Sequence, residues 1–92
     1  MAYNIGEKVE EKDIYSALTD VFRDTFDNDS IVLRPDVTPS DIPGWDSARY
    51  ITLVVATEAR FGIRFEPAEL ESLRTVSDYV ERIEAKLARP VR

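Results

Sequence analysis

Apolar side chains recur three or four residues apart along three stretches of the chain, and this spacing is the strongest constraint on its fold. Within residues 10–26, 47–61 and 75–87, the spacing places them along one side of a helix. Each stripe can therefore supply one face of a shared core. The three stripes are Ile14, Leu18, Val21, Phe22 and Phe26; Tyr50, Leu53, Val54, Thr57 and Phe61; and Val76, Tyr79, Val80, Ile83 and Leu87.

Local signals place the ends of these helices and add a short one. Gly62 stops the helix over 47–61, because glycine readily adopts the positive φ found just past a helix end. Pro67 suits the first position of a short helix over 67–73, and Thr75 caps the last helix. We therefore predict an all-α fold, a four-helix bundle with a long loop between helices one and two and a short third helix.

The connection from residue 27 to residue 46 contains too much proline for a central strand or a further helix. It holds Pro35, Pro39, Pro43 and Gly44. A loop of this length in a small domain is usually functional. We expect its apolar side chains to pack it against the core. These side chains are Ile31, Val32, Leu33, Val37, Ile42 and Trp45.

The composition suits one compact domain and excludes most side-chain chemistries. The 92 residues include no cysteine and no histidine, so a thiol nucleophile, an imidazole base and the usual zinc ligands are absent. A net charge of -6 disfavours nucleic acid, and no apolar run approaches the about 20 residues that span a bilayer. We expect a single cytoplasmic domain over 1–92, ordered over about 10–88 with mobile ends, without metal or membrane insertion.

Ser47 is the candidate functional residue, because it lies where the long loop meets a helix. Aspartate and serine often only cap helices, so Asp46-Ser47 has a purely structural interpretation. In the functional interpretation, the N–H groups of the helix start favour a phosphate-linked group on Ser47. The chain has no histidine to activate a serine, so we predict no catalytic residue.

The helix over 47–61 carries a second uncharged stripe opposite the one that faces the core. A surface helix of such a domain buries only one face, so the second stripe predicts a contact surface for a partner protein. Two alternatives stay open, since isolated surface apolar residues are ordinary and the loop could cover them. The stripe comprises Ala48, Ile51, Thr52, Val55 and Ala59.

Short motifs in a fixed order resemble those of acyl carrier and peptidyl carrier proteins. Asp46-Ser47 matches the Asp-Ser pair that opens the second helix in that family. Further segments resemble the end of the second helix, the third helix and the start of the fourth, in family order over about residues 14–87. These segments are Phe61-Gly62-Ile63 with Phe65, Glu69-Leu70, and Arg74-Thr75-Val76.

This resemblance implies a phosphoprotein that carries cargo and is not an enzyme. A phosphopantetheinyl transferase would attach 4′-phosphopantetheine to Ser47, with Asp46 aiding recognition. The arm then holds an acyl or aminoacyl group as a thioester. The implied partners are a loading enzyme and a downstream transferase or synthase of fatty acid, polyketide or nonribosomal peptide biosynthesis, with the carrier itself a monomer.

Two departures from the family pattern indicate a specialised, stand-alone carrier. Ala48 follows the serine where the family usually has leucine or methionine, and Arg49 and Arg60 lie on a helix that is acidic in fatty-acid carriers. We expect these three residues to act in partner binding together with the outer stripe. The alternative is an unmodified adaptor that uses the same helix, but an adaptor has no reason to keep the hydroxyl of Ser47 there.

Overall fold

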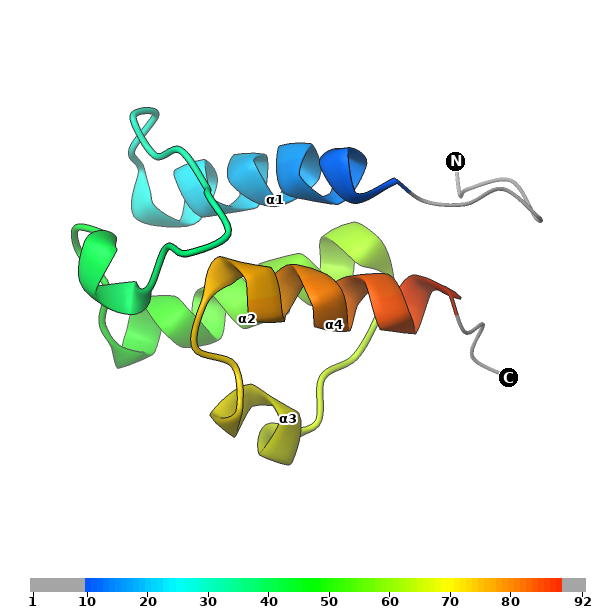
Figure 1. The fold of residues 1–92 in the computed structure, drawn as a ribbon. Helices are drawn as coiled ribbons and strands as arrows, with labels where there is room; N and C mark the ends of the chain where they lie inside the picture. Colours follow the sequence, from blue (N-terminus) through cyan, green and yellow to red (C-terminus); the bar gives the residue numbers. More distant parts are fainter. Residues whose placement is uncertain (1–9, 89–92) are drawn as a thin grey trace.

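The computed structural model describes residues 10–88, which fold into a bundle of helices (Figure 1). No strand occurs within 10–88, so the predicted all-α class, with its long first connection and short third helix, is confirmed. The ends predicted to be mobile lie outside the described residues. The elements are α1 (Glu11–Phe26), the single 3₁₀ turn η1 (Pro39–Asp41), α2 (Ser47–Phe61), α3 (Pro67–Glu71) and α4 (Val76–Ala88).

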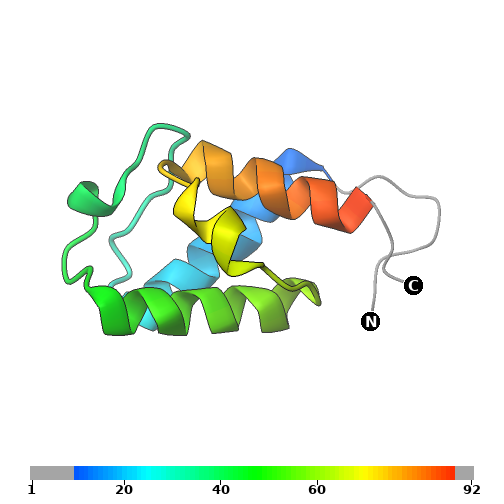
Figure 2. The same cartoon turned by 90° about the horizontal axis from the view of Figure 1, so that it is seen from below.

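The helices α1, α2 and α4 enclose the core. α1 runs towards the end of the bundle at which both α2 and α4 begin, and the long loop covers that end (Figure 1). α3 crosses between α2 and α4 (Figure 2). Trp45 and Tyr50 are half-buried and pack against the core. Six residues predicted to form the core are indeed buried, namely Phe22, Leu53, Val54, Phe61, Val80 and Ile83.

α1 and α2 both end where the sequence predicts, at a residue with positive φ. Asp27 follows α1 with φ 50°, and Gly62 follows α2 with φ 68°. The N–H of Gly62 donates to the carbonyl of Glu58 at 2.8 Å. Glycine adopts this left-handed conformation without the steric cost that a Cβ brings, which makes Gly62 an effective stop signal.

The third helix is shorter than predicted, ending at Glu71 instead of residue 73. The N–H groups of Ser72 and Leu73 bond to carbonyls three residues back, at 3.1 and 3.3 Å, which is the tightened pattern of a helix end. The chain must turn here because the next helix begins at Val76. Periodicity alone could not detect this early end.

Thr75 and Asp78 cap α4 reciprocally, as predicted for Thr75. The N–H of Asp78 donates to Oγ1 of Thr75 at 3.2 Å. In return, the N–H groups of Arg74 and Thr75 donate to Oδ2 of Asp78 at 3.0 and 3.2 Å. These two hydrogen bonds lower the pKa of Asp78, because they stabilise its ionised form. Helix four therefore starts at a well-defined residue.

The long loop packs against the bundle through alternate side chains. Ile31, Val37 and Ile42 are buried, whereas Val32 is 60% exposed, so the prediction that Val32 anchors the loop was wrong. Successive side chains of extended backbone point to opposite sides, so Ile31 and Val32 do not both face the core. The loop also forms η1, a turn that the sequence analysis did not predict.

The loop supplies hydrogen-bond acceptors to the start of α4. The N–H of Val76 donates to the carbonyl of Val37 at 2.9 Å, and that of Ser77 donates to the carbonyl of Pro35 at 3.0 Å. A helix start leaves its first N–H groups without partners inside the helix, and here the loop satisfies two of them. The start of α4 is therefore occupied by the protein itself.

Candidate functional site

Asp46 caps α2, and Ser47 is the first residue of the helix. Oδ1 of Asp46 accepts the N–H of Arg49 at 2.8 Å, and its carbonyl accepts the N–H of Tyr50 at 2.9 Å. The structural interpretation of the Asp-Ser pair is thus satisfied by Asp46 alone. Ser47 is exposed, and its hydroxyl makes no hydrogen bond to any residue within 10–88. This hydroxyl therefore has no structural task in the described fold.

The first amides of α2 remain available for an anion. The N–H groups of Ser47 and Ala48 have no acceptor among the described residues. Such N–H groups, at the positive end of the helix dipole, stabilise a negative charge placed beside them. Ser77 makes a useful contrast, because it also lies in the first turn of a helix but the loop already binds its N–H. Among the α-helices of residues 10–88, the start of α2 alone combines a serine with free amides.

Arg49 and Gly44 tie the loop to the first turn of α2. Nη1 of Arg49 donates to the carbonyl of Gly44 at 3.1 Å. Gly44 has φ 84°, and a Cβ at this position would lie 2.8 Å from Nη1 of Arg49. The next residue, Trp45, stacks on Phe26 with 5.6 Å between ring centroids and contacts Tyr50 at 5.3 Å. The loop end that precedes Ser47 is therefore held in place by the hydrogen bond to Gly44 and by the packing of Trp45.

A cavity of about 250 Å³ lies beside this junction. Trp45 and Tyr50, which flank Ser47 in the sequence, both line it. Burial raises the pKa of the Tyr50 phenol, because it disfavours the charged phenolate. An apolar cavity of about 150 Å³ already suffices to bind benzene, so there is room for a small acyl group. Other lining residues are Phe22, Val37, Ile42, Leu53, Leu70, Leu73 and Val76.

This cavity has no counterpart among the features predicted from the sequence. Its lining comes from α1, the long loop, α2 and the segment around α3 and the start of α4. No single stretch carries a pattern that marks it, because the lining residues from α1, α2 and α4 also fit ordinary core stripes. Whether these residues enclose a cavity or fill the core depends on how the four segments are arranged in space.

The predicted partner face of α2 is open to solvent. Ile51 is 63% exposed and Val55 is 59% exposed, so the loop does not cover them. Arg60 is only loosely paired, with Nη2 lying 4.0 Å from Oδ2 of Asp20. Arg49 has a structural contact with Gly44, which the sequence did not suggest. All seven predicted residues are exposed: Ala48, Arg49, Ile51, Thr52, Val55, Ala59 and Arg60.

No side chain within residues 10–88 forms a hydrogen bond with the hydroxyl of Ser47. Within 10–88 no three acidic, histidine or cysteine side chains cluster as metal ligands would, and no helix has the length and apolar character needed to cross a membrane. The carboxylate of Asp46, the acidic group next to Ser47, is engaged by the N–H of Arg49. The site therefore presents a hydroxyl without a general base to activate it.

Comparison with known proteins gives a consistent result. A family model described as phosphopantetheine attachment site matches residues 16–83. The acyl carrier protein of Thermotoga maritima is 30% identical over 76 residues, which cover 83% of this chain and 94% of that protein. The acyl carrier protein of Micrococcus luteus is 27% identical over 78 residues, covering 85% and 96%.

A solved structure is similar in both fold and sequence. The solution structure of a holo acyl carrier protein from Geobacter metallireducens matches with a TM-score of 0.79 and 41% identity. The match covers 83% of this chain and 87% of that protein. The likeness therefore extends over the bundle as a whole, and it includes a protein in its modified, holo form.

Proposed function

Since this chain belongs to the acyl carrier protein family with a phosphopantetheine attachment site, we propose that Ser47 is the residue to which its covalent 4′-phosphopantetheine is attached. The observation that carries this assignment is the exposed hydroxyl of Ser47 at the open start of α2. Within residues 10–88 the other serine in the first turn of an α-helix, Ser77, has its N–H bound by the loop. Ser72 already donates its hydroxyl to the carbonyl of Glu69 at 2.8 Å.

The residues around Ser47 fit a phosphate-linked arm. The N–H groups of Ser47 and Ala48, which have no acceptor among residues 10–88, provide donors for a phosphodiester, and the helix dipole adds a favourable field. Asp46 orients the helix start through its bond to Arg49, and its exposed position lets a transferase contact it. When bound, the arm supplies a terminal thiol that holds the cargo as a thioester.

The cavity beside Ser47 supports an acyl or aminoacyl cargo of modest size. Its walls are mainly aliphatic and aromatic, so they shelter an apolar group from water. Trp45 and Tyr50, which are close to Ser47 in the sequence, form part of these walls. The protein thus contributes the attachment point and shelter, while partner enzymes of a biosynthetic pathway contribute the chemistry. These partners are a phosphopantetheinyl transferase, a loading enzyme and a downstream transferase or synthase.

The test is an intact-mass measurement after coexpression with a broad-specificity phosphopantetheinyl transferase. We expect the wild-type chain to gain one phosphopantetheine, Ser47→Ala to gain none, and the matched control Ser77→Ala to gain one. Modification of Ser47→Ala would place the arm elsewhere. An unshifted wild-type mass with several transferases would favour the unmodified adaptor, which uses the outer face of α2 without an arm.

A further inference from the structure

A second hollow lies at the far end of α2 from Ser47. It is a groove of about 830 Å³, more than three times the volume of the cavity beside Ser47. The last turns of α2, the turn at 62–64 and α4 enclose it. Small and apolar side chains form much of its surface, namely Val55, Ala59, Ile63 and Ala85. Because Val55 is 59% exposed, the groove is continuous with the outer face of α2.

The charges along the groove are mainly positive, although the whole chain has a net charge of -6. Arg64, Arg82 and Lys86 line it, and Glu58 is the single carboxylate among the lining residues. Oε2 of Glu58 accepts the N–H of Phe65 at 2.9 Å, so this carboxylate is engaged with the backbone. Arg64 is exposed and forms no ion pair within residues 10–88.

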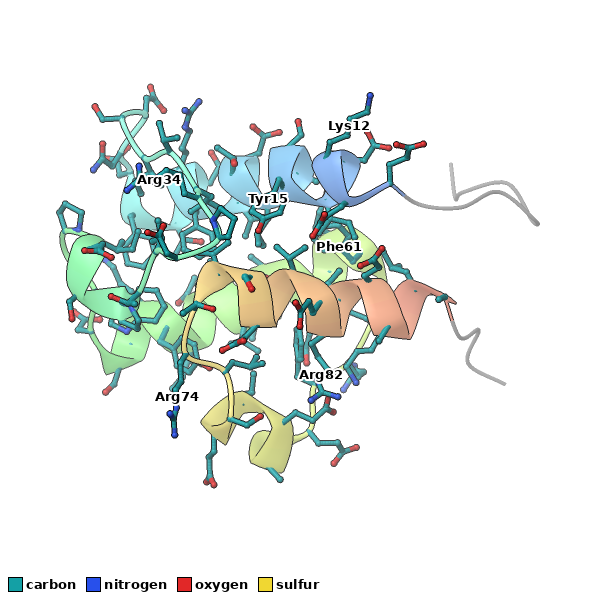
Figure 3. The ribbon with its side chains drawn as sticks, viewed as in Figure 1. Lys12, Tyr15, Arg34, Phe61, Arg74 and Arg82 are labelled. Atoms are coloured by element: carbon teal, nitrogen blue, oxygen red, sulfur yellow. The ribbon has the colours of Figure 1, made fainter. Side chains whose placement is uncertain are left out.

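The other two cations contact α3 to different degrees. Nζ of Lys86 lies 2.9 Å from Oε1 of Glu69 and 5.6 Å from the centroid of the Phe65 ring, so Lys86 is held in place. Nε of Arg82 is 3.5 Å from the same carboxylate oxygen, but 44% of the Arg82 side chain stays exposed. Figure 3 shows Arg82 on the side of α4 that faces α3. Arg64 and Arg82 therefore remain able to bind carboxylates.

From these contacts we propose that the groove binds an acidic, amphipathic segment of a partner protein. An apolar side chain of that segment covers Val55 and Ala85, while its carboxylates meet Arg64 and Arg82. Complementary charge selects this occupant, because a basic segment would be repelled by both arginines. The groove lies at the opposite end of α2 from Ser47, so this inference rests on the proposed function only in assuming that the partners are enzymes that use the carrier.

The probes are two synthetic helical peptides that differ only in charge. Both place leucine on one face, and the other face carries glutamate in one peptide and lysine in the other. Each is titrated into the full-length, ¹⁵N-labelled protein while amide signals are followed by NMR. We expect the glutamate peptide alone to shift signals of residues 55–64 and 82–86. Its affinity should fall as salt rises, because exposed charges are screened.

Two variants locate the binding site, and one matched control removes the effect of net charge. Arg64→Glu should weaken binding of the glutamate peptide about three- to tenfold, since it replaces an attraction by a repulsion. Ala85→Glu should weaken it similarly, and it decides the question if Arg64→Glu does not fold. Arg34→Glu makes the same charge change on the loop, at the other end of the molecule from Arg82 (Figure 3), and should bind as wild type does.

Several outcomes would overturn the proposal. These are binding of neither peptide, equal binding of both, shifts confined to α1 or the loop, and equal losses in Arg34→Glu and Arg64→Glu. Groove shifts that grow with protein concentration before any peptide is added would show that a second copy of the chain is the occupant. Because Ser47→Ala can be titrated in the same way, failure of the groove proposal is distinguishable from failure of arm attachment. Unchanged binding by that variant is the expected result.

Discussion

The two ends of α2 expose different groups to solvent. At its first turn the helix exposes the hydroxyl of Ser47 and two amides that have no acceptor in the described part of the chain, and the loop packs beside them. At its last turn it buries Phe61 in the core and meets a groove with positive charge. One helix can therefore hold a chemical group at one end and distinguish partners at the other, because its core-facing stripe fixes both ends to the same bundle.

The largest effect that tests this comparison is on folding stability. Phe61 is 6% exposed, whereas Val55, on the outer face of the same helix, is 59% exposed. Phe61→Ala should lower the free energy of unfolding by about 3–5 kcal/mol, and Val55→Ala by less than about 0.5 kcal/mol. Denaturation in urea, followed by circular dichroism, measures both. Similar losses in the two variants would show that the faces of α2 are not distinct in the way described.

An intermediate effect distinguishes Asp46 from Ser47. Asp46→Ala removes the bond from the N–H of Arg49 and should lower the free energy of unfolding by about 0.5–2 kcal/mol. Ser47→Ala should cost less than about 0.5 kcal/mol, because the hydroxyl has no partner among the described residues. The same denaturation experiment compares them. If Ser47→Ala lowers the free energy of unfolding more than Asp46→Ala does, the hydroxyl of Ser47 has a structural role. The start of α2 would then not present a group that is free for attachment.

A smaller effect concerns Arg60 and partner choice. Arg60 is preferable to Arg49 for this test, because Arg49 also holds Gly44. We expect Arg60→Glu to speed acyl transfer by a synthase with a basic docking patch about two- to fivefold at low salt, with little change at high salt. Initial transfer rates are measured for this variant and for Arg34→Glu. Equal gains in both would mean that net charge, and not the face of α2, controls the encounter.

The smallest effect is on acid stability, far from the start of α2. The N–H of Glu66, followed by Lys86 and Arg82, lowers the pKa of Glu69 from its usual 4.5. A lowered folded-state pKa stabilises the fold above pH 4.5, and this contribution disappears as the pH falls through the lowered value. Glu69→Gln should therefore flatten the loss of stability below pH 4.5, whereas the exposed Glu71→Gln should not. If the free energy of unfolding falls with pH in the same way in both variants, this assignment is contradicted.

Much of the fold could be predicted because helix starts and ends depend on nearby residues. The bounds of α2 follow from Asp46 and Gly62, and the start of α4 follows from Thr75. Ser47 also stood out from the sequence, since a loop rich in proline delivers it to a helix start. Such signals act within one helical turn, so a single sequence reveals them. The prediction of Ser47 as the attachment site still awaits its mass measurement.

Other features were decided by the tertiary structure. Val32 faces solvent because Ile31 takes the core position, and α3 ends early because the chain turns into α4. The cavity beside Ser47 and the groove around Arg64 and Arg82 each combine segments that are distant in sequence. The sequence by itself determined which residues start and stop α2, start α4 and fill the core. Where those helices leave space, and which arginines of residues 10–88 form no ion pair, depends on packing between segments, which no local pattern contains.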